Sequence, residues 1–341
     1  MGALFMNWKM AVGSSVLGLM LLAGCGGGQE ATTGDQGQAE KEPAQETTTY
    51  KVGITQIVEH PSLDAATDGF KKALEDAGLT VEYDEQIAQG DQNNNMTIAN
   101  NFVGNKVDLI FANSTPSAQS ALNATSEIPI VFTSVTDPVG AELVEAMDKP
   151  GANITGTTDT HPDAIPNTVK FIDQYFEGNK VGMIYNAGEQ NSVAQVDLVK
   201  KAMEGTDLEV VEVSVSTSAE VKQAAESLIG SVDVIYVITD NTVVSALESV
   251  VGVANENDIP LFVGELDSVA RGGFAAYGFD YYDIGFEAGQ MAAQILKGEK
   301  TTADLPVQYP QNLKLLINKN AAAEMGIELN PEWDGIAEYA E

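Results

Sequence analysis

The chain has 341 residues, with 17 lysines and arginines against 50 aspartates and glutamates, so its formal net charge is −33. A surface this negative repels the phosphates of nucleic acids and disfavours anionic lipid headgroups, which excludes a nucleic-acid partner. One cysteine and two histidines exclude a disulfide within the chain and a cysteine-based metal site, and they leave little for zinc, so we expect no metal.

The first 24 residues have the pattern of an export signal. Lys9 is their one charged side chain, and it precedes an apolar run from Met10 to Ala23. That run is about fourteen residues long, short of the roughly twenty that span a bilayer, and small residues follow it, as in a signal peptide. Leu22-Ala23-Gly24-Cys25 resembles the bacterial lipobox, in which the cysteine carries lipid. We therefore expect residues 1–24 to be removed and Cys25 to anchor the protein to the outer face of the cell membrane. The alternative is a chance cysteine after an ordinary signal peptide.

Residues 25–49 are expected to be a tether. From 26 to 49 there is no Val, Ile, Leu, Phe or Met. Such a segment cannot bury apolar surface and is predicted to be flexible.

From Tyr50 onward, short β-branched runs alternate with helical stretches, which predicts doubly wound α/β architecture. Residues 63–78 are predicted to form a helix that ends at Gly78. Near-continuous apolar runs are typical of strands buried on both faces of a parallel sheet. The predicted strands are 51–58, 107–112, 128–135, 180–186, 232–239 and 259–265.

The body also contains an internal repeat. Residues 107–122 align with 232–247, 51–56 with 180–185, and 128–132 with 259–263, at offsets between 125 and 131. Three matches in the same order predict two similar Rossmann-like lobes, about 50–158 and 159–277. Ligands of open α/β sheets sit beyond the carboxyl ends of the strands, so two lobes predict a cleft that closes by hinge motion.

Small polar residues follow the predicted strands and form the candidate ligand site. Ser114 and Thr115 suit the start of a helix, with Pro116 next, so they indicate either an anion site or simple capping. Asp240 is interpreted as a carboxylate for a ligand ammonium or, again, as a cap. Together they suit a zwitterionic α-amino acid. The candidates are Gln56, Ser114, Thr115, Thr133, Ser134, Tyr185, Glu189, Asn191, Ser192, Asp240, Asn241, Thr242 and Tyr281, the last as a wall of an apolar pocket; Glu265 is a further strand-end carboxylate.

Signatures of catalysis are missing. The sequence has no G-x-x-x-x-G-K-[ST], G-x-S-x-G, H-E-x-x-H or C-x-x-C motif. We therefore predict a binding protein without catalytic residues or cofactor.

Five blocks resemble the ABC-transporter substrate-binding lipoproteins of the TrpX-like family. The resemblance implies a type I periplasmic-binding-protein fold in which residues of about 279–304 return to the first lobe and about 305–341 to the second. It implies import of a small solute, an aromatic amino acid above all, with a permease and its ATPase as partners and a monomeric receptor. The blocks are 54–64 (ITQIVEHPSLD), 132–144 (FTSVTDPVGAELV), 181–202, 236–251 and 277–299.

Two other functions stay open from the sequence. A lipoprotein that senses a ligand for a signalling partner needs the same closing cleft. A carboxylate-type lipoprotein enzyme needs two carboxyls with perturbed pKa values in one pocket. The acidic composition is further interpreted as an adaptation to a saline or alkaline exterior.

Overall fold

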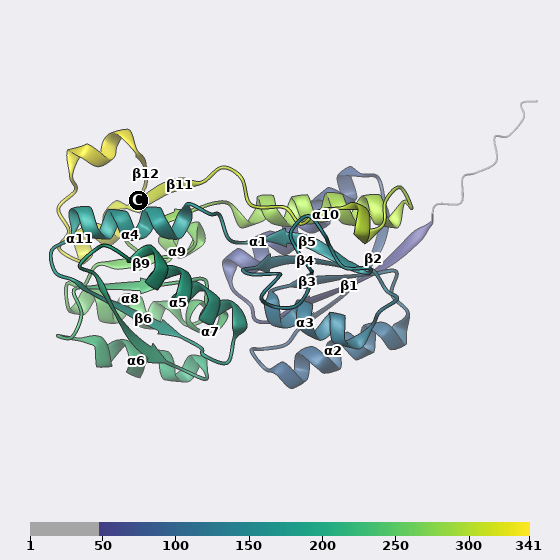
Figure 1. Ribbon diagram of the computed structural model, residues 1–341, viewed down its shortest axis with the longest axis horizontal. Helices are drawn as coiled ribbons and strands as arrows, with labels where there is room; N and C mark the ends of the chain where they lie inside the picture. The colour runs from purple at the N-terminus through teal and green to yellow at the C-terminus, as the bar shows by residue number, and fades with distance from the viewer. Residues whose placement is uncertain (1–47) are drawn as a thin grey trace, which may run out of the picture. The chain divides into compact units, whose positions relative to one another are not determined.

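The computed structural model describes residues 48–341, which form two α/β lobes (Figure 1). The predicted signal peptide, Cys25 and nearly all of the predicted tether lie outside the described residues. The sheet of the first lobe is wholly parallel, as its apolar strands predict. Its strands, in spatial order, are β2 (Thr80–Ile87), β1 (Thr49–Gln56), β3 (Leu109–Asn113), β4 (Ile130–Val135) and β5 (Ile154–Thr158).

Helices cover both faces of this sheet. The helix predicted over 63–78 is α1 (Pro61–Asp76), followed by Gly78 at a φ of 72°. The other helices of this lobe are α2 (Gln92–Asn105), α3 (Thr115–Ala124) and, from much later in the chain, α10 (Tyr281–Leu296). Helix α10 packs against α1 so closely that a Cβ at Gly285 would lie 1.9 Å from the carbonyl oxygen of Ala66. Glycine is therefore required at the crossing of these two helices.

The second lobe has a seven-stranded sheet. Five of its six neighbouring strand pairs are parallel, whereas β10 and β11 pair antiparallel. The spatial order is β12 (Ala337–Ala340), β11 (Lys314–Asn318), β10 (Ala275–Gly278), β9 (Leu261–Val263), β8 (Val234–Val237), β6 (Lys180–Tyr185) and β7 (Glu209–Ser214).

The helices of the second lobe enclose its apolar core, to which Phe171, Phe262, Phe274 and Trp333 contribute a cluster of aromatic rings. They are α4 (Ala164–Tyr175), α5 (Gln190–Ala202), α6 (Val221–Leu228), α7 (Asn241–Val244), α8 (Leu247–Glu256), α9 (Leu266–Ala270) and α11 (Lys319–Glu324), with 3₁₀ turns at Ser218–Glu220 and Pro331–Gly335; a further 3₁₀ turn, Thr302–Asp304, lies beside β5 of the first lobe.

The chain passes between the lobes after β5, after β10 and again before β11. On this last passage Gln308 forms an isolated bridge with Thr157 of β5. No helix among residues 48–341 is long and apolar enough to cross a membrane.

The two-lobed α/β fold and all six predicted strands are confirmed, but further strands escaped the sequence analysis. The edge strands β2 and β7 have mostly exposed or half-buried side chains, so they lack the apolar run that marks a central strand. Strand β5 is buried, yet its sequence ITGTT is polar. Its threonine hydroxyls donate hydrogen bonds to backbone carbonyls, so the strand can be buried without an apolar run.

Candidate ligand-binding site

The first lobe presents buried polar residues where β3 and β4 end. Ser114 follows β3 with a φ of 113°, and Ser134 lies within the end of β4 with a φ of 55°. Both angles are costly for residues with a Cβ, and such strain is retained mainly where the surrounding structure enforces it, often at ligand sites. Ser114 also caps α3, since its Oγ accepts from the backbone N–H of Ser117 at 3.4 Å. The capping function that the sequence predicted is therefore present.

Polar atoms without partners gather beside these residues. Within residues 48–341, the hydroxyls of Thr115 and Ser134 and the Nδ2 of Asn95 are buried without a hydrogen bond. Asn95 is held by Ser117, whose Oγ donates to Asn95 Oδ1 at 3.2 Å. Thr115 and Ser134 thus leave hydroxyls free at the ends of β3 and β4, and a buried polar group left unpaired costs about 1–3 kcal/mol.

In the second lobe the predicted residues form one cluster around Glu189. Its Oε1 accepts from the Thr242 hydroxyl at 2.8 Å, and its Oε2 accepts from Asn241 Nδ2 at 2.5 Å. Asn191 Nδ2 lies 3.4 Å from the same Oε2, while Asn191 Oδ1 has no partner among the described residues. Burial, and secondarily the charge of Asp240, raises the pKa of Glu189 to about 7.

Both carboxyl oxygens of Asp240 already accept hydrogen bonds from donors of the protein. It caps the short helix α7, because one carboxyl oxygen accepts from the backbone N–H of Val243 at 2.7 Å. The other oxygen accepts from the Asn186 backbone N–H at 2.6 Å and from the Ser192 hydroxyl at 2.7 Å. Burial raises the pKa of Asp240 as well. The capping interpretation is thus the one that the described contacts support, and a contact of Asp240 with a ligand stays a prediction.

Two buried carboxyls in one cluster repel each other when both are charged. None of the ion pairs among residues 48–341 includes Glu189 or Asp240. The single arginine, Arg271, pairs instead with Glu248. A cation brought by a ligand would therefore relieve the repulsion that the protein leaves in place.

Four other predicted residues are engaged elsewhere, and their ligand contacts stay predictions. Gln56 links β1 to α1, because its Nε2 donates to Asp64 at 2.8 Å and its Oε1 accepts from Thr67. Three predicted hydroxyls bond within the protein: Thr133 to Thr157 at 2.8 Å, Tyr185 to the partly exposed Glu212 at 2.9 Å, and Tyr281 to the buried Asp159 at 2.9 Å.

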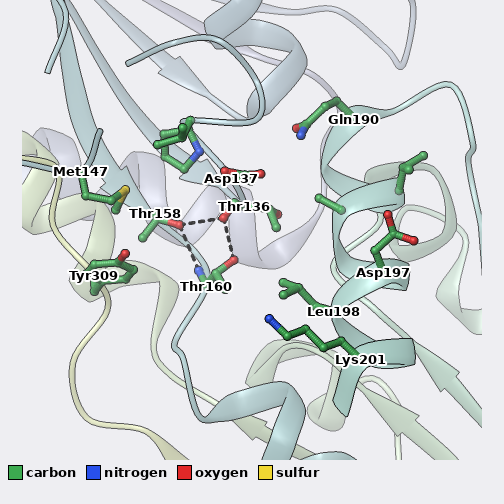
Figure 2. Close-up of a pocket in the computed structure, with 14 residues that line it drawn as sticks. Thr136, Asp137, Met147, Thr158, Thr160, Gln190, Asp197, Leu198, Lys201 and Tyr309 are labelled. Carbon is green, nitrogen blue, oxygen red and sulfur yellow. Dashed lines mark hydrogen bonds between the residues drawn. The ribbon is translucent and has the colours of Figure 1, made fainter. Parts of the chain in front are cut away.

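Cavities lie between the lobes, and the smaller of the two described next adjoins the cluster. A small one of about 110 Å³ is lined by Glu189, Asn241 and Thr242 of the second lobe and by Ile57 and Gly90 of the first. A wider groove of about 630 Å³ opens beside α5, with Leu198 and Lys201 on one side and Met147 and Tyr309 on the other (Figure 2). Helices α3 and α5, which begin at Thr115 and Gln190, contact each other across the lobes. The strand ends of the two lobes therefore meet.

Sequence reasoning missed Gln195 and Thr136, which join the lobes directly. Gln195 Nε2 donates to Thr136 Oγ1 at 3.0 Å, and Thr136 in turn donates to Asp159 at 3.0 Å. Gln195 lies one helical turn after Asn191 on α5, so helical periodicity was a usable signal. Asp159 follows a strand that the apolar pattern did not mark.

Comparison with known proteins identifies the family of this chain. The family model described as "ABC transporter substrate binding protein" matches residues 51–338. The chain is 42% identical over 320 residues to a protein named "Tyrosine-binding protein" from Clostridioides difficile, covering 92% of this chain and 91% of the relative.

Two solved structures bear on the arrangement of the lobes. An ABC domain in complex with L-Trp from Streptococcus pneumonia has a TM-score of 0.81 at 32% identity, covering 86% of this chain and 99% of that one. A ligand-free, open substrate-binding protein with adhesive properties from Clostridium difficile has a TM-score of 0.63 at 39% identity, covering 86% and 99%. The described lobes thus lie nearer to the arrangement of the tryptophan complex than to the open one.

More distant solute-binding proteins share the type I periplasmic-binding-protein fold alone. The family and its relatives bind solutes and are not enzymes. The chain therefore belongs to the substrate-binding proteins of ABC transporters.

Proposed function

We propose that this protein binds an aromatic amino acid between its lobes and delivers it to an ABC permease and its ATPase. The observation that carries the proposal is the pairing of chemistries at the strand ends. Unpartnered hydroxyls of Thr115 and Ser134 lie in one lobe, and the Glu189–Asp240 carboxyl cluster lies in the other. Hydroxyls and the N–H groups at the start of α3 suit a ligand carboxylate, and the acid cluster suits a ligand ammonium.

The choice of an aromatic side chain rests on two supports. The relatives named above are a tyrosine-binding protein and a complex with L-Trp. The groove beside α5 supplies apolar surface of its own from Val139, Val193, Leu198 and Tyr309, each between 38% and 42% exposed. An aromatic ring covering part of this surface would gain about 25 cal/mol for each Å² removed from water.

Calorimetric titration with tyrosine, tryptophan and phenylalanine, and with two truncated analogues of each, tests the ligand. An arylpropionate lacks the ammonium and an arylethylamine lacks the carboxylate, so both should bind at least tenfold more weakly than the amino acid. Binding of a sugar or nucleoside in place of amino acids would refute the assignment.

The Glu189→Gln variant tests the ammonium site. Gln keeps the shape but removes the charge, so affinity for the amino acid should fall about ten- to a hundredfold. Binding of the arylpropionate should change little, because it has no ammonium. Glu209→Gln, at an exposed position of β7, is the matched control and should bind like the parent chain. Equal losses for the amino acid and the arylpropionate would contradict the role of Glu189.

We further propose that Cys25 carries the lipid that holds the protein, as a monomer, on the outer face of the cell membrane. The support is the sequence Leu22-Ala23-Gly24-Cys25 after a short apolar run. Cys25→Ser should release the protein from the membrane fraction and abolish incorporation of an acyl-chain probe. Deleting the gene should abolish uptake of the labelled amino acid; intact uptake with altered signalling would favour a sensor instead.

A further inference from the structure

Among residues 48–341, two buried side-chain hydrogen bonds join the lobes, and one of them lies at the carboxyl end of β9. Ser62, the second residue of α1, donates its Oγ proton to Glu265 Oε2 at 2.7 Å. Glu265 follows β9 of the other lobe and precedes α9, which contacts α1 (Figure 1). Both side chains are at least 98% buried. The other bond, from Gln195 to Thr136, lies beside the ligand site.

Glu265 sits in surroundings that favour its neutral form. Burial raises the pKa of Glu265 to about 7, and its hydrogen bonds from Ser62 and Ser268 offset only part of that rise. The charged or titratable groups that act on it are Asp267 and Arg271 at α9, Asp159 after β5 and Tyr281 at the start of α10.

The nearby His60 adds no charge at neutral pH. Burial, and secondarily Arg271, lowers the pKa of His60 to about 4. Asp267 raises the pKa of Glu265 and Arg271 lowers it, so burial is the main influence on that pKa.

Opening the lobes would undo this contact. Ser62 and Glu265 belong to different lobes, so separation breaks their hydrogen bond and returns the carboxyl to water. The described arrangement is nearer to that of a tryptophan complex than to that of an open relative, as the TM-scores of 0.81 and 0.63 indicate. The Ser62–Glu265 contact is therefore a feature of the closed form.

We propose that Ser62 and Glu265 form a latch that stabilises the closed lobes and couples lobe closure to pH. The closed form holds a proton on Glu265 that the open form releases, because in water the carboxyl returns to its ordinary acidity. Closure is accordingly favoured as pH falls through about 7 and loses this support above it. Between pH 8 and pH 6 the closing equilibrium should shift about tenfold toward the closed form.

Small-angle X-ray scattering of the chain carrying Cys25→Ser tests the latch without any amino acid. The radius of gyration at pH 6 should be smaller than at pH 8. Glu265→Gln, a permanent mimic of the neutral carboxyl, should be more compact than the parent chain at pH 8. Ser62→Ala should shift the equilibrium about tenfold toward the open form at pH 6.

Ser268→Ala is the matched control. It removes a hydrogen bond of 3.0 Å to the same Glu265 oxygen, but Ser268 belongs to the same lobe as Glu265. It should therefore keep the pH response, and circular dichroism should show all variants folded. A pH response of Glu265→Gln as large as that of the parent chain, or dimensions of Ser62→Ala equal to those of the parent chain at pH 6, would overturn the latch. The latch rests on the proposed function only in that closure encloses a ligand. Because the scattering experiment contains no amino acid, failure of the latch can be told apart from failure of the proposed ligand-binding function.

Discussion

Asp240 offers a prediction that separates a structural role from a binding role. Its carboxyl accepts three hydrogen bonds, from the backbone N–H groups of Asn186 and Val243 and from the Ser192 hydroxyl, and it is fully buried. Asp240→Ala leaves these three donors unpaired. At about 1–2 kcal/mol each, their loss amounts to about 3–6 kcal/mol. Removing a buried carboxyl next to Glu189 offsets part of this, so the free energy of unfolding should fall by about 3 kcal/mol.

Urea unfolding monitored by circular dichroism measures that loss. Asp91→Ala is the reference, because Asp91 caps α2 at an exposed position and its removal should cost only about 1 kcal/mol. If Asp240→Ala costs no more than Asp91→Ala, the reasoning from buried donors is wrong. Calorimetry on the folded variant then tests the sequence-based prediction that Asp240 contributes about 1–3 kcal/mol to ligand binding. Unchanged affinity would leave Asp240 as a cap alone.

Two further predictions concern the solvent. Because burial raises the pKa values of Glu189 and Glu265 to about 7, the folded chain binds more protons than the unfolded chain between about pH 4.5 and 7; stability is lost as pH rises through that range. The free energy of unfolding should be larger at pH 5.5 than at pH 8 by about 2 kcal/mol for each carboxyl, and greater stability at pH 8 in urea titrations would contradict this. With a net charge of −33, the melting temperature should rise between low and molar NaCl, since salt screens self-repulsion; a steady fall in calorimetry would contradict the interpretation of the acidic surface.

The sequence predicted the architecture well where burial leaves a pattern. Central strands such as β4 are buried throughout, so their apolar runs were visible, and the repeat located the equivalent strands of the second lobe. The edge strand β2 and the threonine-rich β5 have no such pattern. Their positions follow from pairing with β1 and β4, and single-segment periodicity carries no information about pairing.

The candidate site was predictable in part. Turn chemistry identified Ser114 and Asp240, because capping residues and ligand residues share the ends of strands. Whether such a residue caps a helix or binds a ligand depends on which donors hydrogen-bond to its oxygen atoms. The sequence does not show these donors. Ser62 and Glu265 lie 203 residues apart, and only the closed packing of the lobes brings them together.

The packing of α10 against α1 has a consequence for the order of folding. The first lobe takes Ile284, Ala288 and Ala292 of α10 into its core, although every strand of its sheet lies before residue 159. Most of the second lobe must therefore be synthesised before α10 is available to cover α1 of the first lobe. Contacts over such sequence distances form slowly. The second lobe is incomplete until later still, because its strands β11 and β12 follow α10 in the chain.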